Sequence, residues 1–243
     1  MNPVAELFNE KFPIRSHLSF DAYVRLWVAD FYSEEVTRVL YLDADIIVVG
    51  DIVELFNIDL GDAVLGAVPI PWYDRNNLPG YKREYGYFNS GVLLFNIARW
   101  RESNAHERVV EYIVEYRDII RDADQDSLNA CLFNEKYNLP LEWNVMNAYF
   151  RGQPIGHLSA AEVDRIGMAA KAIHFAGSSK PWHYMSNHPK KELYYEYISM
   201  TPWAKYTPPD RTLFNIIMKN LADIMPSPLK RKLKFVVGAA ENK

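Results

Sequence analysis

The feature that most constrains the fold is an apolar run, residues 38–52, which a single pair of carboxylates interrupts. Its aliphatic and β-branched residues are typical of a strand covered on both faces. Asp43 and Asp45 lie two positions apart, so on an extended chain both side chains point to the same side. Two carboxylates placed in this way can share one divalent cation, which offsets the cost of burying their charge. The alternative is a strand that ends at Leu42, with both carboxylates in the following turn.

Length and composition favour one main domain. The 243 residues, 49% of them hydrophobic, suffice to bury a substantial core and leave room for a small C-terminal extension. The single cysteine, Cys131, excludes an intramolecular disulfide and fits a reducing compartment.

Charge is unevenly distributed along the chain. The formal net charge is −4, but residues 201–243 carry eight Lys or Arg against three Asp or Glu. An acidic body argues against nucleic-acid binding, whereas a basic tail permits contact with anionic lipid head groups. The chain shows no signal-peptide pattern and no apolar run long enough to span a bilayer. We therefore expect a cytoplasmic protein, with peripheral contact between its tail and the inner face of the cytoplasmic membrane.

Hydrophobic periodicity predicts alternating helices and strands. We expect helices over 21–32, 100–121 and from residue 213, and a short helical turn over 51–56. We expect buried strands over 63–70 and 87–97, a strand over 137–145 that is broken at Pro140, and a short strand over 171–175. Residues 72–86 are predicted to form a long loop, and such loops in compact domains are often functional. Residues 181–206, rich in Trp, Tyr and Pro, are predicted to form an irregular cap.

Two polar segments precede apolar elements. Asn89-Ser90-Gly91 opens a strand, where turn chemistry alone explains these residues, although Gly91 also lets a ligand approach the backbone closely. Residues 122–126 contain three Asp at the start of a helical stretch. One Asp suffices as an N-cap, so the other two suggest a further role.

Residues 174–182 combine a histidine, a flexible turn and a lysine. His174 can ligate a metal through one ring nitrogen, and the amides of Gly177, Ser178 and Ser179 can face a phosphate that Lys180 neutralises. The alternative is a structural histidine followed by an ordinary turn. The chain contains no Walker-type phosphate loop.

Together these segments resemble glycosyltransferase family 8, particularly the bacterial lipopolysaccharide galactosyl- and glucosyltransferases. The matching pieces keep their order over residues 13–182: Tyr23-Val-Arg-Leu, Leu40-Tyr-Leu-Asp-Ala-Asp, Tyr87-Phe-Asn-Ser-Gly-Val-Leu, Asp124-Gln-Asp, Leu141-Glu-Trp-Asn and His174-Phe-Ala-Gly-Ser-Ser-Lys-Pro-Trp.

The resemblance implies an α/β fold of the GT-A type. We expect a mostly parallel sheet flanked by helices over residues 1–182, and a small helical, aromatic-rich and basic extension over 183–243. In the family, a first strand and its loop contact the uracil base upstream of the helix that holds Arg25. Only about twenty residues precede that helix, so we expect the chain to be shortened at this end, or another element to substitute for that strand.

The resemblance also implies a role for each site residue. Asp43, Asp45 and His174 would hold Mn²⁺, with Mg²⁺ as the alternative ion. The residues expected to bind the nucleotide and the donor sugar are Arg25, Gly177 and Lys180 around the diphosphate, Ala44 against the ribose, and Asn89, Ser90 and Asp124 at the sugar hydroxyls. Gln125 and Asp126 would lie near the reacting face of the sugar.

The implied reaction is retaining transfer of a hexose from UDP-galactose or UDP-glucose to a saccharide acceptor, in lipopolysaccharide or another cell-envelope glycan. Gln125 is a poor nucleophile, which favours same-face attack; a covalent role for Asp126 is the alternative. Tyr87, Trp143 and Trp182 would shape the acceptor site, or else serve as packing residues. Two other functions stay open: a non-catalytic nucleotide- or sugar-binding remnant, and a haloacid dehalogenase-like phosphatase.

Overall fold

A computed structural model describes residue 12 and residues 21–224. Contacts within the chain divide it into two compact units, Met1–Ser178 and Ser179–Lys243. The boundary that the sequence places after Trp182 stays a prediction.

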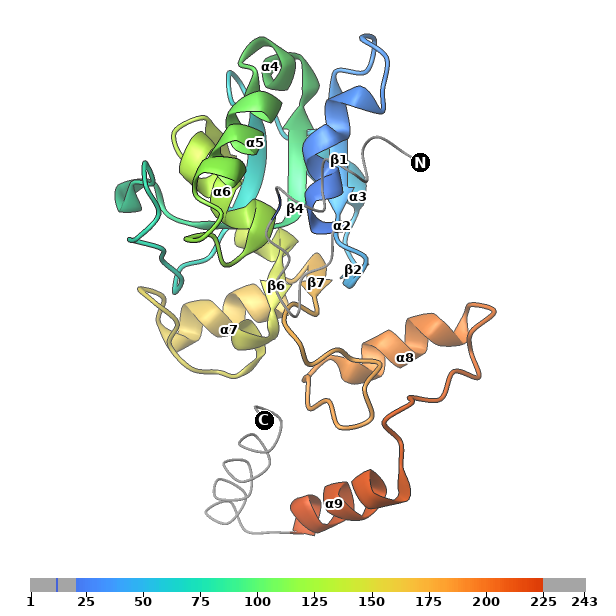
Figure 1. Cartoon of the computed structure of the whole chain (residues 1–243). Helices are drawn as coiled ribbons and strands as arrows, with labels where there is room; N and C mark the ends of the chain where they lie inside the picture. The colour runs from blue at the N-terminus through green and yellow to red at the C-terminus, as the bar shows by residue number, and fades with distance from the viewer. Residues whose placement is uncertain (1–11, 13–20, 225–243) are drawn as a thin grey trace. The chain divides into compact units, whose positions relative to one another are not determined.

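The first unit contains two sheets of described strands. The larger has the order β1 (Arg38–Leu42), β4 (Phe88–Asn96), β3 (Leu65–Pro69) and β5 (Lys136–Asn138). The smaller has the order β2 (Ile46–Val48), β7 (Ala172–His174) and β6 (Val145–Met146). The chain passes from the first sheet to the second directly between β1 and β2, where the pair of aspartates lies (Figure 1).

The strand directions confirm the α/β class but correct the expectation of a mostly parallel sheet. In the described part of the chain, β4 is antiparallel to β1 and β3, and β7 is antiparallel to β2. Only β3 with β5 and β6 with β7 pair in parallel. The connection between the two strands of each parallel pair contains at least one α-helix. Parallel strands need a long crossover connection of this kind. The loop between β3 and β4 instead returns the chain directly alongside β3.

β4 is the central strand of the core. Leu93 and Phe95 belong to one apolar cluster, with residues of the helices that cover that face, and Val92 and Leu94 to a second cluster that includes Leu55. Both sets are fully buried, because alternate side chains of a strand point to opposite faces. Figure 1 shows α4 (Ile97–Glu102), α5 (Ala105–Glu115) and α6 (Ala123–Leu132) following β4 and packing together.

Two predicted helices are interrupted. Residues 21–30 form α2 (Asp21–Val24) and a 3-10 segment, η1 (Arg25–Asp30), with non-helical backbone at Trp27. The helix expected over 100–121 is split into α4 and α5, because Asn104 has a left-handed φ of 50°. The short helical turn is α3 (Ile52–Phe56), whose first amides are capped by the Asp51 side chain.

Three further 3-10 segments and one further helix complete the described elements of the first unit. η2 (Arg83–Tyr85) lies in the loop between β3 and β4, whereas η3 (Leu141–Trp143), η4 (Asn147–Phe150) and α7 (Ala160–Met168) follow β5. A Ser159 and Glu162 capping box begins α7.

The second unit contains α8 (Lys191–Ser199) and α9 (Leu213–Ile224). α9 confirms the predicted helix from residue 213, whereas α8 corrects the expectation of a wholly irregular cap over 181–206. The basic segment 229–234 lies outside the described residues, so its membrane contact stays a prediction. Among residues 21–224, no helix combines the length and apolarity needed to cross a bilayer.

Candidate active site

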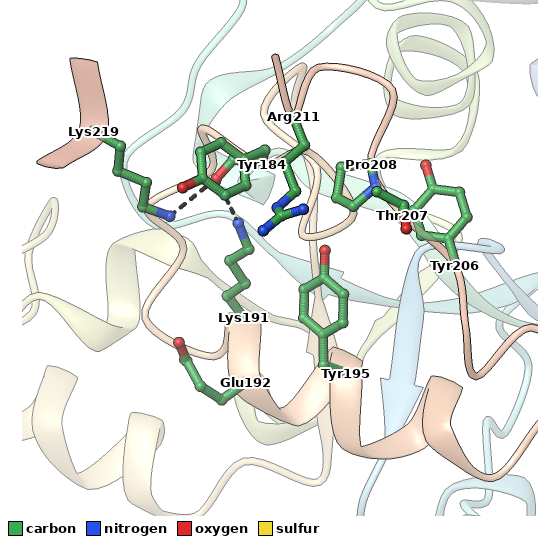
Figure 2. A pocket seen from close by; sticks show the side chains of 9 residues that line it. All are labelled: Tyr184, Lys191, Glu192, Tyr195, Tyr206, Thr207, Pro208, Arg211 and Lys219. Atoms are coloured by element: carbon green, nitrogen blue, oxygen red, sulfur yellow. Dashed lines mark hydrogen bonds between the residues drawn. The ribbon is translucent and has the colours of Figure 1, made fainter. Parts of the chain in front are cut away.

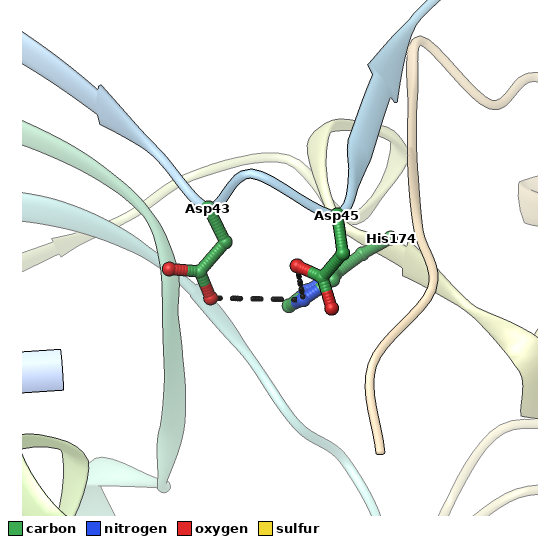
Figure 3. A group of neighbouring side chains, drawn as sticks. All are labelled: Asp43, Asp45 and His174. Carbon is green, nitrogen blue, oxygen red and sulfur yellow. Dashed lines mark ion pairs between the residues drawn. The ribbon is translucent and has the colours of Figure 1, made fainter. Parts of the chain in front are cut away.

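The turn between β1 and β2 brings Asp43 and Asp45 to the place where the two sheets meet. The Asp43 amide donates to the Gly91 carbonyl at 2.8 Å, which ties the turn to β4. β2 pairs with β7 so that Ile46 lies opposite His174. This register places His174 beside Asp45, although the two are far apart in the sequence. Figure 3 shows the three side chains directed toward one another.

These three side chains form a candidate metal site. Their ligand atoms all lie within 4.8 Å of one another. His174 Nε2 is 3.2 Å from Asp45 Oδ1 and 3.7 Å from Asp43 Oδ2. His174 is buried and the carboxylates are partly exposed, so the site is rigid on one side and accessible on the other. Two carboxylates and one imidazole suit a moderately hard divalent ion.

A hydrogen-bonded amide chain fixes which nitrogen of His174 faces the site. The Gly91 backbone N–H donates to Asn89 Oδ1 at 2.9 Å, which identifies that atom as the oxygen. Asn144 Nδ2 donates to the same oxygen at 2.8 Å, so Asn144 Oδ1 faces His174 Nδ1 at 2.8 Å. Nδ1 must therefore carry a proton, which leaves the Nε2 lone pair of the neutral ring for a metal.

Gly91 leaves the space that this arrangement needs. A Cβ at this position would lie 2.5 Å from His174 Cε1 and 2.8 Å from both Asp43 Oδ2 and Asn89 Oδ1. Any larger residue would push the histidine and the carboxylate apart. The glycine thus has a steric function at the metal site, and the donor set fits a cation.

Arg25 contacts Asp43 of this site. Its side chain is buried, with Nη2 3.0 Å from Asp43 Oδ1 and Nε 3.3 Å from Asp124 Oδ2. Nη1 donates to the Ser90 carbonyl, and the guanidinium lies 4.2 Å from the centre of the Tyr41 ring. Tyr41 also donates to Asp43 Oδ1 at 2.8 Å. The orientation of Asp43 is therefore fixed by two donors.

Asp124 is a buried carboxylate with one oxygen only partly satisfied. Burial raises the pKa of its carboxyl group to about 6, against the opposing effects of Arg25 and the Ser90 side chain. Within the described part of the chain, Oδ2 forms the ion pair with Arg25 but no hydrogen bond. A buried acceptor of this kind is suited to a ligand hydroxyl.

Gln125 is held in one orientation by its neighbours. Its Oε1 accepts from Asn89 Nδ2 at 2.8 Å and from the Ser90 amide at 3.1 Å. Its Nε2 donates to the Tyr87 hydroxyl at 3.2 Å. The structure thus brings together Asn89, Ser90 and Gln125, which are predicted to contact the donor sugar.

Asp126 has a different environment. It is fully buried and accepts four hydrogen bonds: from Tyr87 at 2.7 Å, Arg75 at 2.7 Å, and the amides of Arg121 at 2.7 Å and Asp122 at 3.1 Å. Donors of the protein thus replace the hydrogen bonds that water would make to this carboxylate.

The other predicted site residues lie as follows. Ala44 is exposed in the turn between the two aspartates. Gly177, with a left-handed φ of 92°, ends the first unit, whereas Lys180 belongs to the second, where its amide donates to His183. Trp143 is buried in the second apolar cluster and Trp182 contacts Tyr194. The roles of these residues in ligand binding stay predictions.

Sequence reasoning gave no role to two residues that organise the site. Asn144 is the last residue of the Leu141-Glu-Trp-Asn segment. Its place directly after a tryptophan was the one sequence feature that could have indicated a role for it. Arg75 lies in the polar 72–86 loop, where a charged residue indicates only exposure, yet it is buried against Asp126.

Comparison with known proteins agrees with this geometry. Residues 2–186 match the sequence profile described as Glycosyl transferase family 8. General stress protein A of Bacillus subtilis is 30% identical over 194 residues, which cover 77% of this chain and 68% of that protein. The lipopolysaccharide 1,3-galactosyltransferase of Salmonella typhimurium is 28% identical over 205 residues, but the match covers only 58% of its length and 79% of this chain.

A solved structure shares the fold. The crystal structure of the galactosyltransferase LgtC, in complex with donor and acceptor sugar analogues, superimposes with a TM-score of 0.65 at 28% identity. The match covers 82% of this chain and 73% of LgtC, which confirms the GT-A type of fold. With the ordered motifs and the convergence of Asp43, Asp45 and His174, these matches show that the chain belongs to glycosyl transferase family 8.

Proposed function

We propose that Asp43, Asp45 and His174 hold a divalent cation, Mn²⁺ or alternatively Mg²⁺, and that the site binds the diphosphate of a UDP-hexose. The convergence of three ligand atoms within 4.8 Å carries this proposal. Such a cation supplies positive charge that stabilises the departing nucleoside diphosphate. Arg25 contributes through Asp43, whose carboxylate it orients, and Gly177 and Lys180 are proposed to contact the phosphates.

The proposed reaction is transfer of galactose or glucose with retention of configuration. The hydroxyls of the donor sugar form hydrogen bonds with Asp124 Oδ2, which accepts, and with Asn89 and Ser90. Ala44 packs against the ribose of UDP. Gln125 faces the reacting side of the sugar with its amide held by three hydrogen bonds. An amide is a poor nucleophile, which favours attack by the acceptor on the face that the leaving group vacates.

Asp126 is proposed to act by positioning Gln125 rather than by forming a covalent bond. It is fully buried and accepts four hydrogen bonds, three at Oδ2 and one at Oδ1, which lower its nucleophilicity, and its Tyr87 donor also contacts Gln125. The Tyr87 hydroxyl donates to Asp126 and accepts from Gln125 Nε2, so Asp126 fixes Gln125 through Tyr87.

The proposed acceptor is a saccharide of a lipopolysaccharide or other cell-envelope glycan. A hollow of about 700 Å³ lies beside Tyr87 and is lined by residues that include Trp72, Tyr73, Asp74, Tyr81, Glu84 and His157. Aromatic faces and polar groups in one hollow are suited to the apolar faces and hydroxyls of a sugar. The lipopolysaccharide transferases that are similar to this chain support this acceptor class.

Calorimetric titration of UDP into the full chain, with and without Mn²⁺, tests the proposal. We expect binding that requires Mn²⁺, its loss in Asp45→Asn and His174→Ala, and no change in Asp62→Asn, which removes an exposed carboxylate outside the site. UDP-galactose and UDP-glucose are then assayed for hydrolysis and for transfer to saccharides.

Three outcomes contradict parts of the proposal. A folded chain that binds no UDP with Mn²⁺ overturns the donor site. Binding without turnover of either UDP-sugar identifies a binding remnant. Release of phosphate from a generic phosphoester identifies a phosphatase instead.

A further inference from the structure

A hollow in the second unit gathers three cationic side chains around one tyrosine. It measures about 440 Å³, and none of the residues of the proposed donor site lines it. Lys191 comes from α8, Lys219 from α9 and Arg211 from the turn before α9. Figure 2 shows Lys191 and Lys219 directed toward Tyr184 and the Arg211 guanidinium between Tyr184 and Tyr195, with Tyr206 beyond Arg211.

The two lysines share a single acceptor. Lys191 Nζ donates to the Tyr184 carbonyl at 2.9 Å and Lys219 Nζ donates to the same oxygen at 3.0 Å. Burial lowers the pKa of the Lys191 ammonium group, and the neighbouring Lys219 lowers it further. Two ammonium groups on one carbonyl repel each other, and an anion between them would relieve that repulsion.

The two lysines differ in what they still offer a ligand. Lys191 also donates to the carbonyls of His183 at 2.7 Å and Ser186 at 3.4 Å, so its donors hold the 183–186 loop. The Tyr184 carbonyl is the one hydrogen-bond acceptor of Lys219 Nζ among residues 21–224. Lys219 therefore has donors left for a ligand.

Arg211 adds the strongest anion-binding group. Its guanidinium carbon lies 5.9 Å from the centre of the Tyr184 ring, and Lys219 Nζ lies 4.8 Å from the same centre. Within the described residues the Arg211 guanidinium makes no hydrogen bond, so its planar array of donors faces the hollow unused.

Nearby carboxylates do not cancel this charge. Glu192 lines the hollow, and Asp210 accepts from the amides of Tyr184 at 2.8 Å and Met185 at 3.1 Å. Asp210 is thus engaged by the loop backbone. Against Lys191, Arg211 and Lys219, the two carboxylates leave an excess of positive charge.

We propose that this hollow binds a phosphoryl group carried by an organic molecule, either a sugar phosphate or a lipid phosphate head group. Arg211 and Lys219 bind the phosphoryl oxygens, because a guanidinium fork pairs with two of them at once. Lys191 fixes the loop that carries Tyr184. The rings of Tyr195 and Tyr206 cover the organic part of the ligand. This site does not depend on the proposed donor site.

The experiment uses the full chain without Mn²⁺ or UDP, so that failure of the donor site leaves its result unaffected. Inorganic phosphate, glucose 1-phosphate and acetate are titrated while amide NMR signals of residues 184–219 are followed. Flotation with phosphatidylglycerol vesicles, and with neutral phosphatidylcholine vesicles, forms the lipid arm.

The test variant is the pair Arg211→Gln and Lys219→Gln, which leaves Lys191 in place to hold the loop. Lys205→Gln is the matched control, because Lys205 is an exposed cation of the same unit outside the hollow. A third variant replaces Lys230, Arg231 and Lys232 by Gln in the basic tail. Circular dichroism verifies that each variant is folded.

We expect the paired variant to weaken binding by about tenfold or more, and Lys205→Gln to leave it unchanged. Saturable binding of glucose 1-phosphate identifies a soluble phosphate ester as the ligand. Binding to phosphatidylglycerol vesicles alone, lost in the paired variant, identifies a lipid head group. Equal binding of acetate, vesicle binding that only the tail variant abolishes, or no binding in either arm overturns the proposal.

Discussion

A continuous series of hydrogen-bonded side chains has aspartates at both ends, and the groups that surround these aspartates differ. At one end, Asp43 Oδ2 and Asp45 Oδ1 face His174 Nε2 across 3.7 Å and 3.2 Å. At the other end, Asp126 is surrounded by four donors. The chain that joins them runs through His174, Asn144, Asn89, Gln125, Tyr87 and Asp126.

The difference separates a ligand site from a scaffold. Three electron-rich atoms that face one another repel unless a proton or a cation lies between them, so the first group is arranged for a ligand. A fully buried carboxylate that accepts four hydrogen bonds is a structural anchor. Aspartates at one end are thus arranged to bind a ligand, and the aspartate at the other end holds the surrounding structure in place. The series of hydrogen bonds between them fixes the orientation of the Gln125 amide.

The largest expected effect is at the anchor. Asp126→Ala removes the nearest carboxylate of the buried Arg75 guanidinium and the acceptor of two backbone amides, and we expect a loss of about 3–5 kcal/mol in unfolding free energy. Asp45→Ala and Asp62→Ala should each change it by less than about 1 kcal/mol. Urea denaturation followed by circular dichroism measures all three. An Asp126→Ala variant as stable as Asp45→Ala would show that the two ends do not differ.

Gly91→Ala should disturb the metal end through packing alone. Its Cβ would meet His174 Cε1 at 2.5 Å, so we expect loss of Mn²⁺-dependent UDP binding and a stability loss of about 1–3 kcal/mol.

Gly66→Ala is the matched control for this packing effect. Its Cβ meets only apolar side chains, Leu60 Cδ2 at 2.8 Å and Leu139 Cδ2 at 3.0 Å. It should cost similar stability but leave Mn²⁺ affinity unchanged. Equal Mn²⁺ affinity in the two variants would refute a steric role for Gly91 at the site.

Asn144→Ala should weaken Mn²⁺ binding by about 10–100-fold, because it removes the acceptor that keeps His174 Nδ1 protonated. Nitrogen NMR of the metal-free chain supplies a second readout: Nδ1 carries the proton in the native chain, and a tautomer mixture is expected in the variant. Asn187→Ala, at an exposed amide, is the control. A purely structural role for Asn144 predicts an unchanged tautomer.

The smallest expected effect is that of Tyr87→Phe. Asp126 keeps three other donors, so the loss of one hydrogen bond should lower stability by only about 1 kcal/mol. Turnover should fall more than UDP binding does, because Gln125 loses the partner of its Nε2. Tyr85→Phe, at an exposed ring, should change neither quantity. A proportional fall in binding and turnover would argue against a positioning role.

The amino-acid sequence by itself determined the buried strands β3, β4 and β7, the pair of aspartates between β1 and β2, and the polar segments around residues 89, 124 and 174. These features are local, since strand periodicity and carboxylate spacing depend on residues close together in the chain. The sequence did not show that β1 and β2 are half-buried strands of different sheets, or that residues 137–145 divide among β5, η3 and β6. The order of the motifs was also sufficient to identify the family and its fold.

Only the tertiary structure decided which polar groups meet. Arg25 and Arg75 occupy helical and loop patterns that indicate exposure, yet each is buried against aspartates far along the chain. Asn144 meets His174 because β6 and β7 pair in parallel, and β4 runs antiparallel to β3 because the loop between them returns the chain alongside β3. Periodicity reports which face of an element is apolar, whereas the stabilisation of a buried charge depends on partners that only folding brings within hydrogen-bonding distance.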